Sequence, residues 1–252
     1  MRYTSATKKH FYSKSALCMI LALFLMVCAF TGCRKTVKER AHMDNEAAPE
    51  MPYSVPGFNM NESIYGTTFD NGLQVLCAGS YSGAFLEDGT DEQVTDILAI
   101  IVRNNGSSLV EYGKIELPLS DKRTATFIFS GLPVGASILI QESSRMQLGE
   151  ARDKSAFVLS ECALPGTIVL DFGNDFEIYT DDGVLNIRNI SGSDITSDVS
   201  VFYKNFEYGL FMGGITYRAR FTGGVKADDI VQALQNHFWV DTSAILYMSY
   251  AS

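Results

Sequence analysis

Residues 127–135 read Phe-Ile-Phe-Ser-Gly-Leu-Pro-Val-Gly. The aromatic and β-branched side chains at its start favour an extended strand. Pro133 fixes its own backbone φ, and Gly135 tolerates a positive φ, so the chain is able to reverse direction directly after the strand. The stretch therefore predicts a β-strand that ends in a tight turn.

Short runs of the same kind fill the rest of the chain after residue 70, and Gly, Asn, Asp and Ser separate them. They are Ile97–Val102, Lys114–Leu117, Thr126–Phe129, Ser137–Ile140, Ala156–Leu159, Thr167–Leu170, Val184–Ile187, Val199–Tyr203, Ile215–Phe221 and Ile245–Met248. Strand-length runs at this spacing are typical of antiparallel β-sandwiches. We therefore expect an all-β fold.

Three blocks of these runs recur in the same order. Arg103-Asn104 recurs as Arg188-Asn189, Phe129-Ser130-Gly131 with Ile138-Leu139 recurs as Phe221-Thr222-Gly223 with Ile230-Val231, and Ser155–Val158 recurs as Ser243–Leu246. Ordered recurrence indicates a duplicated module. We expect two tandem modules, over residues 70–165 and 166–252, with Phe129/Phe221 and Ile138/Ile230 at equivalent positions.

One segment has two interpretations. Residues 228–238 begin with two acidic residues and place apolar residues at helical spacing, which suits a helix. The repeat aligns the same segment with Ile138-Leu139, which suits a strand. We expect a strand over Ile230–Ala233.

The aromatic strand followed by Leu-Pro-x-Gly, at residues 127–135, resembles a motif of immunoglobulin-like bacterial surface modules, including the cell-adhesion-related class. The resemblance implies two immunoglobulin-like sandwiches and a role at the cell surface. The second copy departs from the motif, because Gly224-Val225-Lys226-Ala227 stands at the matching place.

The N-terminus has the layout of an export signal. Residues 1–14 carry four basic residues and no acidic one, and residues 15–32 are uncharged and mostly apolar. Phe30-Thr31-Gly32-Cys33 resembles the lipobox of bacterial lipoproteins, which implies that Cys33 is lipidated (for example with palmitate) and becomes the mature N-terminus. An uncleaved signal anchor and a plain secreted protein are the alternatives. All three place residues 34–252 outside the cytoplasm, and the lipoprotein would sit on the outer face of the bacterial cytoplasmic membrane.

Residues 34–69 follow as a predicted flexible tether, because residues 34–60 are polar and hold three of the six prolines. Residues 1–32 contain 4 of the 20 basic residues and none of the 29 acidic ones, so the remaining chain has a net charge of −13. Such a chain is unsuited to nucleic acid, which requires clustered Lys and Arg.

Two cysteines remain beyond the apolar segment and Cys33. Cys77 and Cys162 form a candidate disulfide in an exported protein, and two free thiols are the alternative.

The sequence lacks the usual signatures of an enzyme. His237 is the one histidine beyond the predicted tether, and no Gly-x-Ser-x-Gly, His-Glu-x-x-His or Cys-x-x-Cys motif accompanies it. The acidic stretch between Asp171 and Gly183 offers oxygen ligands, yet its spacing misses the EF-hand loop, and turn residues explain it equally. We expect no catalytic site, no metal and no cofactor.

Aromatic residues are dense in the second module. Tyr208 and Phe211 fall in an expected long hairpin loop over residues 206–214, and Trp239 lies near the C-terminus. Exposed aromatics there would form a contact surface for a protein or a glycan, and structural packing within the hairpin is the alternative. We therefore expect a non-enzymatic surface interaction, adhesion or assembly module. The alternative is a solute- or glycan-binding lipoprotein that serves a transporter or an envelope enzyme.

Overall fold

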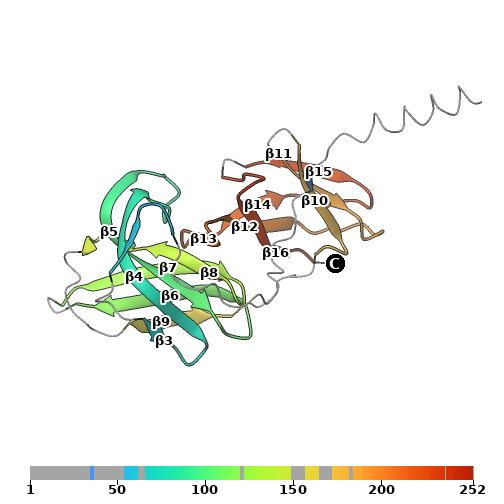
Figure 1. The fold of residues 1–252 in the computed structure, drawn as a ribbon. Coiled ribbons are helices and arrows are strands. Elements are labelled where there is room, and N and C mark those ends of the chain that lie inside the picture. The colour runs from blue at the N-terminus through green and yellow to red at the C-terminus, as the bar shows by residue number, and fades with distance from the viewer. Residues whose placement is uncertain are drawn as a thin grey trace, which may run out of the picture. The chain divides into compact units, whose positions relative to one another are not determined.

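The structure is a computed structural model that describes residues 35–36, 54–61, 66–119, 122–148, 157–164, 172–181, 184–235 and 237–251. The strands are β1 (Lys35–Thr36), β2 (Phe58–Met60), β3 (Thr67–Thr68), β4 (Leu73–Ala84), β5 (Gln93–Asn104), β6 (Val110–Pro118), β7 (Thr124–Leu132), β8 (Ser137–Gln141), β9 (Val158–Ala163), β10 (Phe176–Asp181), β11 (Val184–Asn189), β12 (Val199–Glu207), β13 (Leu210–Met212), β14 (Tyr217–Phe221), β15 (Ile230–Leu234) and β16 (Ser243–Ser249). The all-β prediction is confirmed (Figure 1).

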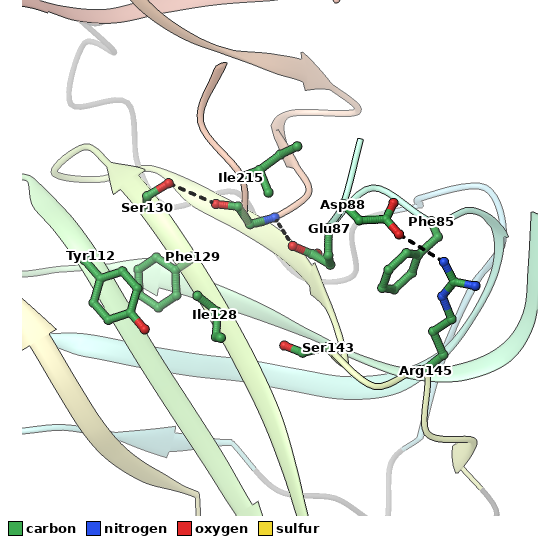
Figure 2. Close-up of a pocket in the computed structure, with 11 residues that line it drawn as sticks. Phe85, Glu87, Asp88, Tyr112, Ile128, Phe129, Ser130, Ser143, Arg145 and Ile215 are labelled. Atoms are coloured by element: carbon green, nitrogen blue, oxygen red, sulfur yellow. Dashed lines mark hydrogen bonds and ion pairs between the residues drawn. The ribbon is translucent and has the colours of Figure 1, made fainter. Parts of the chain in front are cut away.

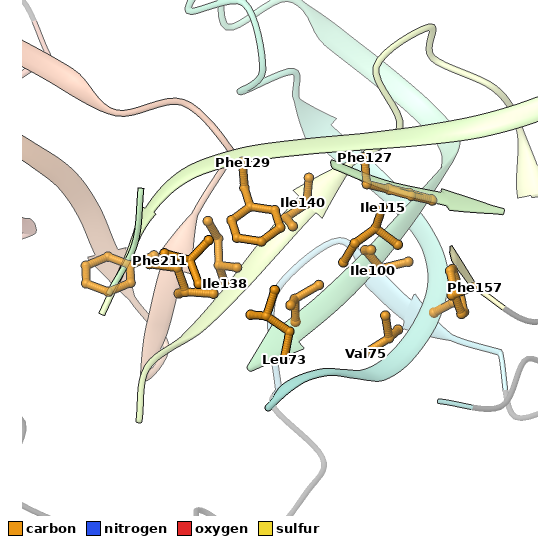
Figure 3. Packing of buried hydrophobic residues seen from close by; sticks show 14 of the residues in the cluster. Leu73, Val75, Ile100, Ile115, Phe127, Phe129, Ile138, Ile140, Phe157 and Phe211 are labelled. Carbon is orange, nitrogen blue, oxygen red and sulfur yellow. The ribbon is translucent and has the colours of Figure 1, made fainter. Parts of the chain in front are cut away.

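Strands β4 to β9 form module 1, an antiparallel sandwich. One sheet contains β4, β5 and β8, with β2 and β3 added to β4, and the facing sheet has the order β7-β6-β9. Side chains from both sheets meet in one core, in which Ile100, Ile115 and Phe127 are fully buried (Figure 3). Alternation along the strands supplies this layer, because every second residue faces the opposite sheet.

Strands β10 to β16 form module 2, which repeats the arrangement. β11 pairs with β10 and β15, and β12 pairs with β14 and β16, all antiparallel. A second core lies between these strands and includes Ile187, Val201 and Phe221. Residues Ile230–Leu234 are extended, so the strand prediction for this segment is confirmed.

A buried asparagine makes the same hydrogen bonds in both modules. The Asn104 side chain donates to the carbonyls of Ser108 (2.9 Å) and Leu132 (3.0 Å) and accepts from the Gly106 N–H. In module 2 the Asn189 side chain donates to the carbonyls of Ser193 (2.7 Å) and Val225 (2.9 Å) and accepts from the Ser191 N–H. Each asparagine stands at the end of a strand and joins the loop that follows it to the residue just before the tight turn, Leu132 or Val225.

The tight turn predicted from Pro133 and Gly135 is present in both copies. Gly135 has a φ of 77°, and the Ala136 N–H bonds to the Pro133 carbonyl at 3.2 Å. In module 2, Asp228 has a φ of 62°, and Asp229 bonds to Lys226 at 3.1 Å. The second copy thus keeps the turn without its proline and glycine.

The prediction that Ile138 and Ile230 occupy equivalent positions in the two modules is wrong by one residue. Ile138 pairs with Val102 of β5, whereas Val231 pairs with Ile187 at the matching place on β11. Phe129 and Phe221 do occupy matching core positions. The cause is one extra residue in module 2 between the core phenylalanine and the turn.

The first strand of each module begins with the same turn. The Gly72 N–H bonds to the Phe69 carbonyl at 3.0 Å before β4, and the Asp175 N–H bonds to the Phe172 carbonyl at 3.0 Å before β10. The acidic stretch between Asp171 and Gly183, considered above as a source of oxygen ligands, therefore includes the turn that starts module 2.

Strand β13 of module 2 extends a sheet of module 1. It leaves β12 through a two-residue turn at Tyr208 and Gly209, both with positive φ, as a tight hairpin requires. It then pairs with β8 in parallel, so that Phe211 lies opposite Ile138. The sheets of the two modules are thereby joined into one continuous nine-stranded sheet.

The sheet of β4, β5 and β8 is buried on both faces. Its outward face carries Ala99, Ile101 and Leu139, which pack against a second cluster that includes Val55 and Leu210. This explains why Ile97–Val102 is continuously apolar rather than alternating.

The predicted tether does not reach residue 69. Strands β2 and β3 lie within it, because Phe58 pairs with Tyr81 and Thr67 pairs with Val75.

Candidate functional site at the module junction

A carboxylate from module 1 anchors the junction. Glu87 follows β4, and its Oε1 accepts from the Gln141 N–H at 2.8 Å, while its Oε2 accepts from the Gly214 N–H at 2.7 Å (Figure 2). Gln141 also belongs to this contact, because its side chain bonds to Ala84 and Leu86. Glu87 therefore holds the end of β8 and the segment after β13 together.

An ammonium group from module 2 holds the same segment from the other side. Lys204 on β12 is fully buried, and its Nζ donates to the carbonyls of Gly213 (3.0 Å), Gly214 (2.8 Å) and Ile215. Three carbonyl acceptors match the three N–H groups of a lysine ammonium. The lysine thereby satisfies backbone oxygens that would otherwise be buried without a partner.

The backbones of the two modules lie in close contact at Gly214. Its carbonyl accepts from the Ser130 N–H at 2.9 Å and lies 3.3 Å from the Ser130 hydroxyl (Figure 2). The Ser130 hydroxyl also lies 2.9 Å from the Thr216 hydroxyl. A Cβ at this position would lie 1.9 Å from the Ile128 carbonyl oxygen and 2.6 Å from Glu87 Oε2. Only glycine fits between the two modules here.

The buried charges perturb each other's titration. Burial raises the pKa of the Glu87 carboxyl to about 7, although the Gln141 and Gly214 N–H groups and the Lys204 charge oppose the rise. Burial also lowers the pKa of Lys204, and the Glu87 charge opposes that shift. The two groups are thus a mutually dependent acid and base inside the junction.

A pocket of about 360 Å³ opens beside these groups. Its lining combines Glu87, Asp88 and Arg145 with the apolar side chains of Phe85, Tyr112, Ile128, Phe129 and Ile215 (Figure 2). Arg145 is already occupied, because it pairs with Asp88 at 3.0 Å and Glu92 at 2.7 Å and lies over the Phe85 ring. These charged groups hold the loop between β4 and β5 rather than facing the pocket unpaired.

The three residues predicted to bind a partner do not form one surface. Phe211 is 2% exposed and lies in the core of module 1 between β8 and β12 (Figure 3), so its predicted exposure is wrong. The reason is that β13 is a docked strand and not a free loop. Tyr208 and Trp239 are about half exposed, at 50% and 48%, in separate turns.

Trp239 belongs to a small aromatic row in module 2. Its ring meets His237 edge-on at 6.1 Å, and His237 stacks on Tyr217 at 4.8 Å. His237 therefore packs among aromatic rings, as its sequence neighbours Phe238 and Trp239 suggest.

The predicted disulfide is absent, since both thiols are free. Cys77 is buried in the outer cluster of module 1, where burial raises the pKa of its thiol to about 11. Cys162 is exposed on β9 in the facing sheet, and Asn71 donates to its Sγ at 3.3 Å. The two side chains thus lie on different sheets, and Cys77 points away from the space between them.

Several predictions concern residues outside the described part. Cys33 and the apolar segment before it belong to this group, as do Thr167–Leu170 and Asp171. Within the described ranges, no helix has the length and hydrophobicity to cross a membrane. Nor do three or more His, Cys, Asp or Glu side chains there gather into a set that would hold a metal ion.

The sequence analysis missed Glu87 and Lys204. A signal existed for Lys204, which stands in a strand between aromatic residues, Val199-Ser-Val-Phe-Tyr-Lys-Asn-Phe206. Glu87 has no comparable signal, because it lies in a polar loop whose partner is 127 residues away.

Comparison with protein-family models, with curated proteins and with solved structures finds no match.

Proposed function

We propose that this chain is a membrane-anchored extracytoplasmic lipoprotein whose two immunoglobulin-like sandwiches act together as a non-enzymatic interaction or assembly module. The basic and apolar N-terminus with Phe30-Thr31-Gly32-Cys33 supports the export and the anchor. The net charge of −13 after residue 32 disfavours a nucleic-acid partner. The partner is then a protein or a glycan at the cell surface.

The commitment of the junction's polar groups to structural bonds is the observation that carries this proposal. Glu87 of module 1 accepts from the Gly214 N–H of module 2, and Lys204 is bonded to the carbonyls beside that glycine. Gln141 is bonded to the backbone after β4, and Arg145 is held by two carboxylates. An enzyme or a solute receptor instead needs polar groups that converge on its ligand. Here those groups are all held in structural bonds, and the bond of Glu87 to Gly214 joins the two modules, which suits a rigid element of a larger assembly.

A solute- or glycan-binding lipoprotein is the second candidate, and the junction pocket favours it. Its volume of about 360 Å³ is at the small end of ligand sites, and such sites prefer domain junctions. Ile128, which is 39% exposed, lines it. If a monosaccharide or disaccharide raises the melting temperature of the protein but not that of Ile128→Trp, this candidate replaces the assembly module.

The anchored module is tested in cells that produce the full chain. We expect radiolabelled fatty acid on the wild type, sedimentation with the envelope, and a larger complex after chemical crosslinking of intact cells. Cys33→Ala should lose the label and the sedimentation, because the thiol that carries the lipid is gone. Labelled Cys33→Ala protein overturns the anchor, and a wild-type chain that stays uncrosslinked overturns the assembly role.

A further inference from the structure

The outer edges of strands β8 and β15 are equivalent in the two modules, but only the edge of β8 is paired with another strand among the described residues. β8 pairs with β5 as β15 pairs with β11, and residues of β15 follow those of β8 by 93 positions. The outer edge of β8 is occupied, because β13 lies along it. Strand β15 ends its sheet among the described residues.

The backbone groups concerned are identified by the occupied copy. At the edge of β8, the Leu139 carbonyl accepts from the Gly213 N–H at 3.0 Å, and the Gln141 N–H donates to Glu87. Their equivalents on β15 are the carbonyl of Gln232 and the N–H of Leu234. Within the described ranges these two groups have no hydrogen-bond partner on the outer side.

The side chains of β15 leave this edge open. Ile230 is 42% exposed and Leu234 is 82% exposed, the highest value among the exposed large hydrophobic residues. The strand reads Ile-Val-Gln-Ala-Leu and carries no charge, proline or glycine. Natural proteins usually block a free edge with such residues, with a bulge or with a covering element. An unblocked apolar edge is typical of a strand that pairs with another chain.

Module 2 does not need a strand to complete its core. In module 1 the strand on the edge inserts Phe211 between the sheets. In module 2 the core includes the ring of Phe238, which follows β15 in the chain, is 6% exposed and meets Tyr203 edge-on at 5.0 Å. The edge of β15 is therefore available in a stably folded module.

We propose that the outer edge of β15 is a binding site for an uncharged apolar β-strand at the tip of a hairpin in another polypeptide, added as β13 is added to β8. This inference rests on the proposed assembly function and names its site. The seated β13 shows the kind of segment that fits, Leu210-Phe211-Met212 after a two-residue turn. A second copy has its own β13 seated on β8, so the donor is a different protein.

The probe for this site is a fluorescent synthetic peptide of residues 203–214, the hairpin that occupies the equivalent edge. Its binding to the full chain, purified in detergent, is followed by fluorescence anisotropy. We expect saturable binding that Leu234→Lys weakens by about tenfold or more, because a charge on the edge repels an apolar strand. Leu164→Lys is the matched control, since Leu164 is also exposed (60%) but lies beyond β9. It should leave binding unchanged.

A second pair of variants tests the backbone. Gln232→Pro removes an N–H on the outer side of β15 and leaves the pairing with β11, whereas Gln232→Val keeps that N–H. Binding should fall in the first and persist in the second, with melting temperatures measured for both.

Three results would overturn the proposal. They are no saturable binding, equal binding by wild type and Leu234→Lys, and self-association of the free chain that Leu234→Lys abolishes. The last would make a second copy the occupant. The assay is independent of the lipid anchor, so failure of fatty-acid labelling at Cys33 would leave its outcome unaffected.

Discussion

Modules 1 and 2 share a scaffold but differ in what lies outside one of their sheets. In module 1, Ile101 and Leu139 face outward into a second apolar cluster. At the equivalent places module 2 has Asn186 and Gln232, beside the ion pair of Arg188 with Glu177 at 3.7 Å. The same sandwich arrangement thus tolerates either apolar or polar residues on this outer face, because the inner core and its turns are specified separately.

The comparison also separates residues that specify the module from residues that specify the junction. Asn104 and Asn189 make the same bonds in both copies and belong to the module. Glu87 and Phe211 connect one module to the other, Lys204 holds the carbonyls beside Gly214, and all three belong to the junction. Changing one class or the other should therefore alter different properties.

The largest effect is expected from Phe211→Ala. The ring is 2% exposed and packs in the core of module 1, so its loss should cost about 3–5 kcal/mol of unfolding free energy. Tyr208→Ala, in the same hairpin, should change the unfolding free energy by no more than about 0.5 kcal/mol, because Tyr208 is half exposed. Denaturant unfolding of both variants makes the comparison, and equal losses would contradict the docked-strand account.

A matched pair, Asn104→Ala and Asn189→Ala, should come next. Each change leaves one buried carbonyl, of Leu132 or Val225, and one partly buried carbonyl without their donor, which costs about 1–3 kcal/mol. We expect losses of similar size, read from chemical denaturation. If only one variant is destabilised, the two networks are not equivalent in energy.

A smaller effect should appear as a pH dependence of the junction. The pKa of Glu87 is raised to about 7 from its ordinary value of 4.5, so between these pH values this carboxyl takes up a proton on folding. Its contribution makes the protein more stable below pH 4.5 and is lost as pH rises to about 7. Glu87→Gln should remove that fall, with a further loss at every pH because its amide replaces an acceptor.

The measurement is the melting temperature of both proteins between pH 4.5 and 8. A wild-type curve that runs parallel to the Glu87→Gln curve would show that Glu87 does not titrate in this range.

Most of the fold could be predicted from local sequence patterns. The strand-length apolar runs, the turn at Gly135 and the order of the repeated blocks all follow from residues near each other in sequence. The strand register of module 2 could not be predicted in this way. One extra residue between Phe221 and Val225 moves Val231 into the place that Ile230 was expected to fill.

The junction escaped prediction for a different reason. Phe211 lies in a segment whose sequence is typical of an exposed hairpin loop. Only the pairing of Phe211 with Ile138, 73 residues earlier, shows that it belongs to a docked strand. Glu87 is likewise defined by a contact to Gly214, 127 residues later, that no local pattern contains.

Amide hydrogen exchange at Gln141 and Leu234 in the full chain is the most direct test of the central claim, that one edge of the duplicated sandwich is covered and the other open. The Gln141 N–H donates to Glu87 beneath β13, whereas the Leu234 N–H faces outward from β15. We predict that Gln141 exchanges about a hundredfold or more slowly than Leu234. Equal protection of the two amides would contradict the claim.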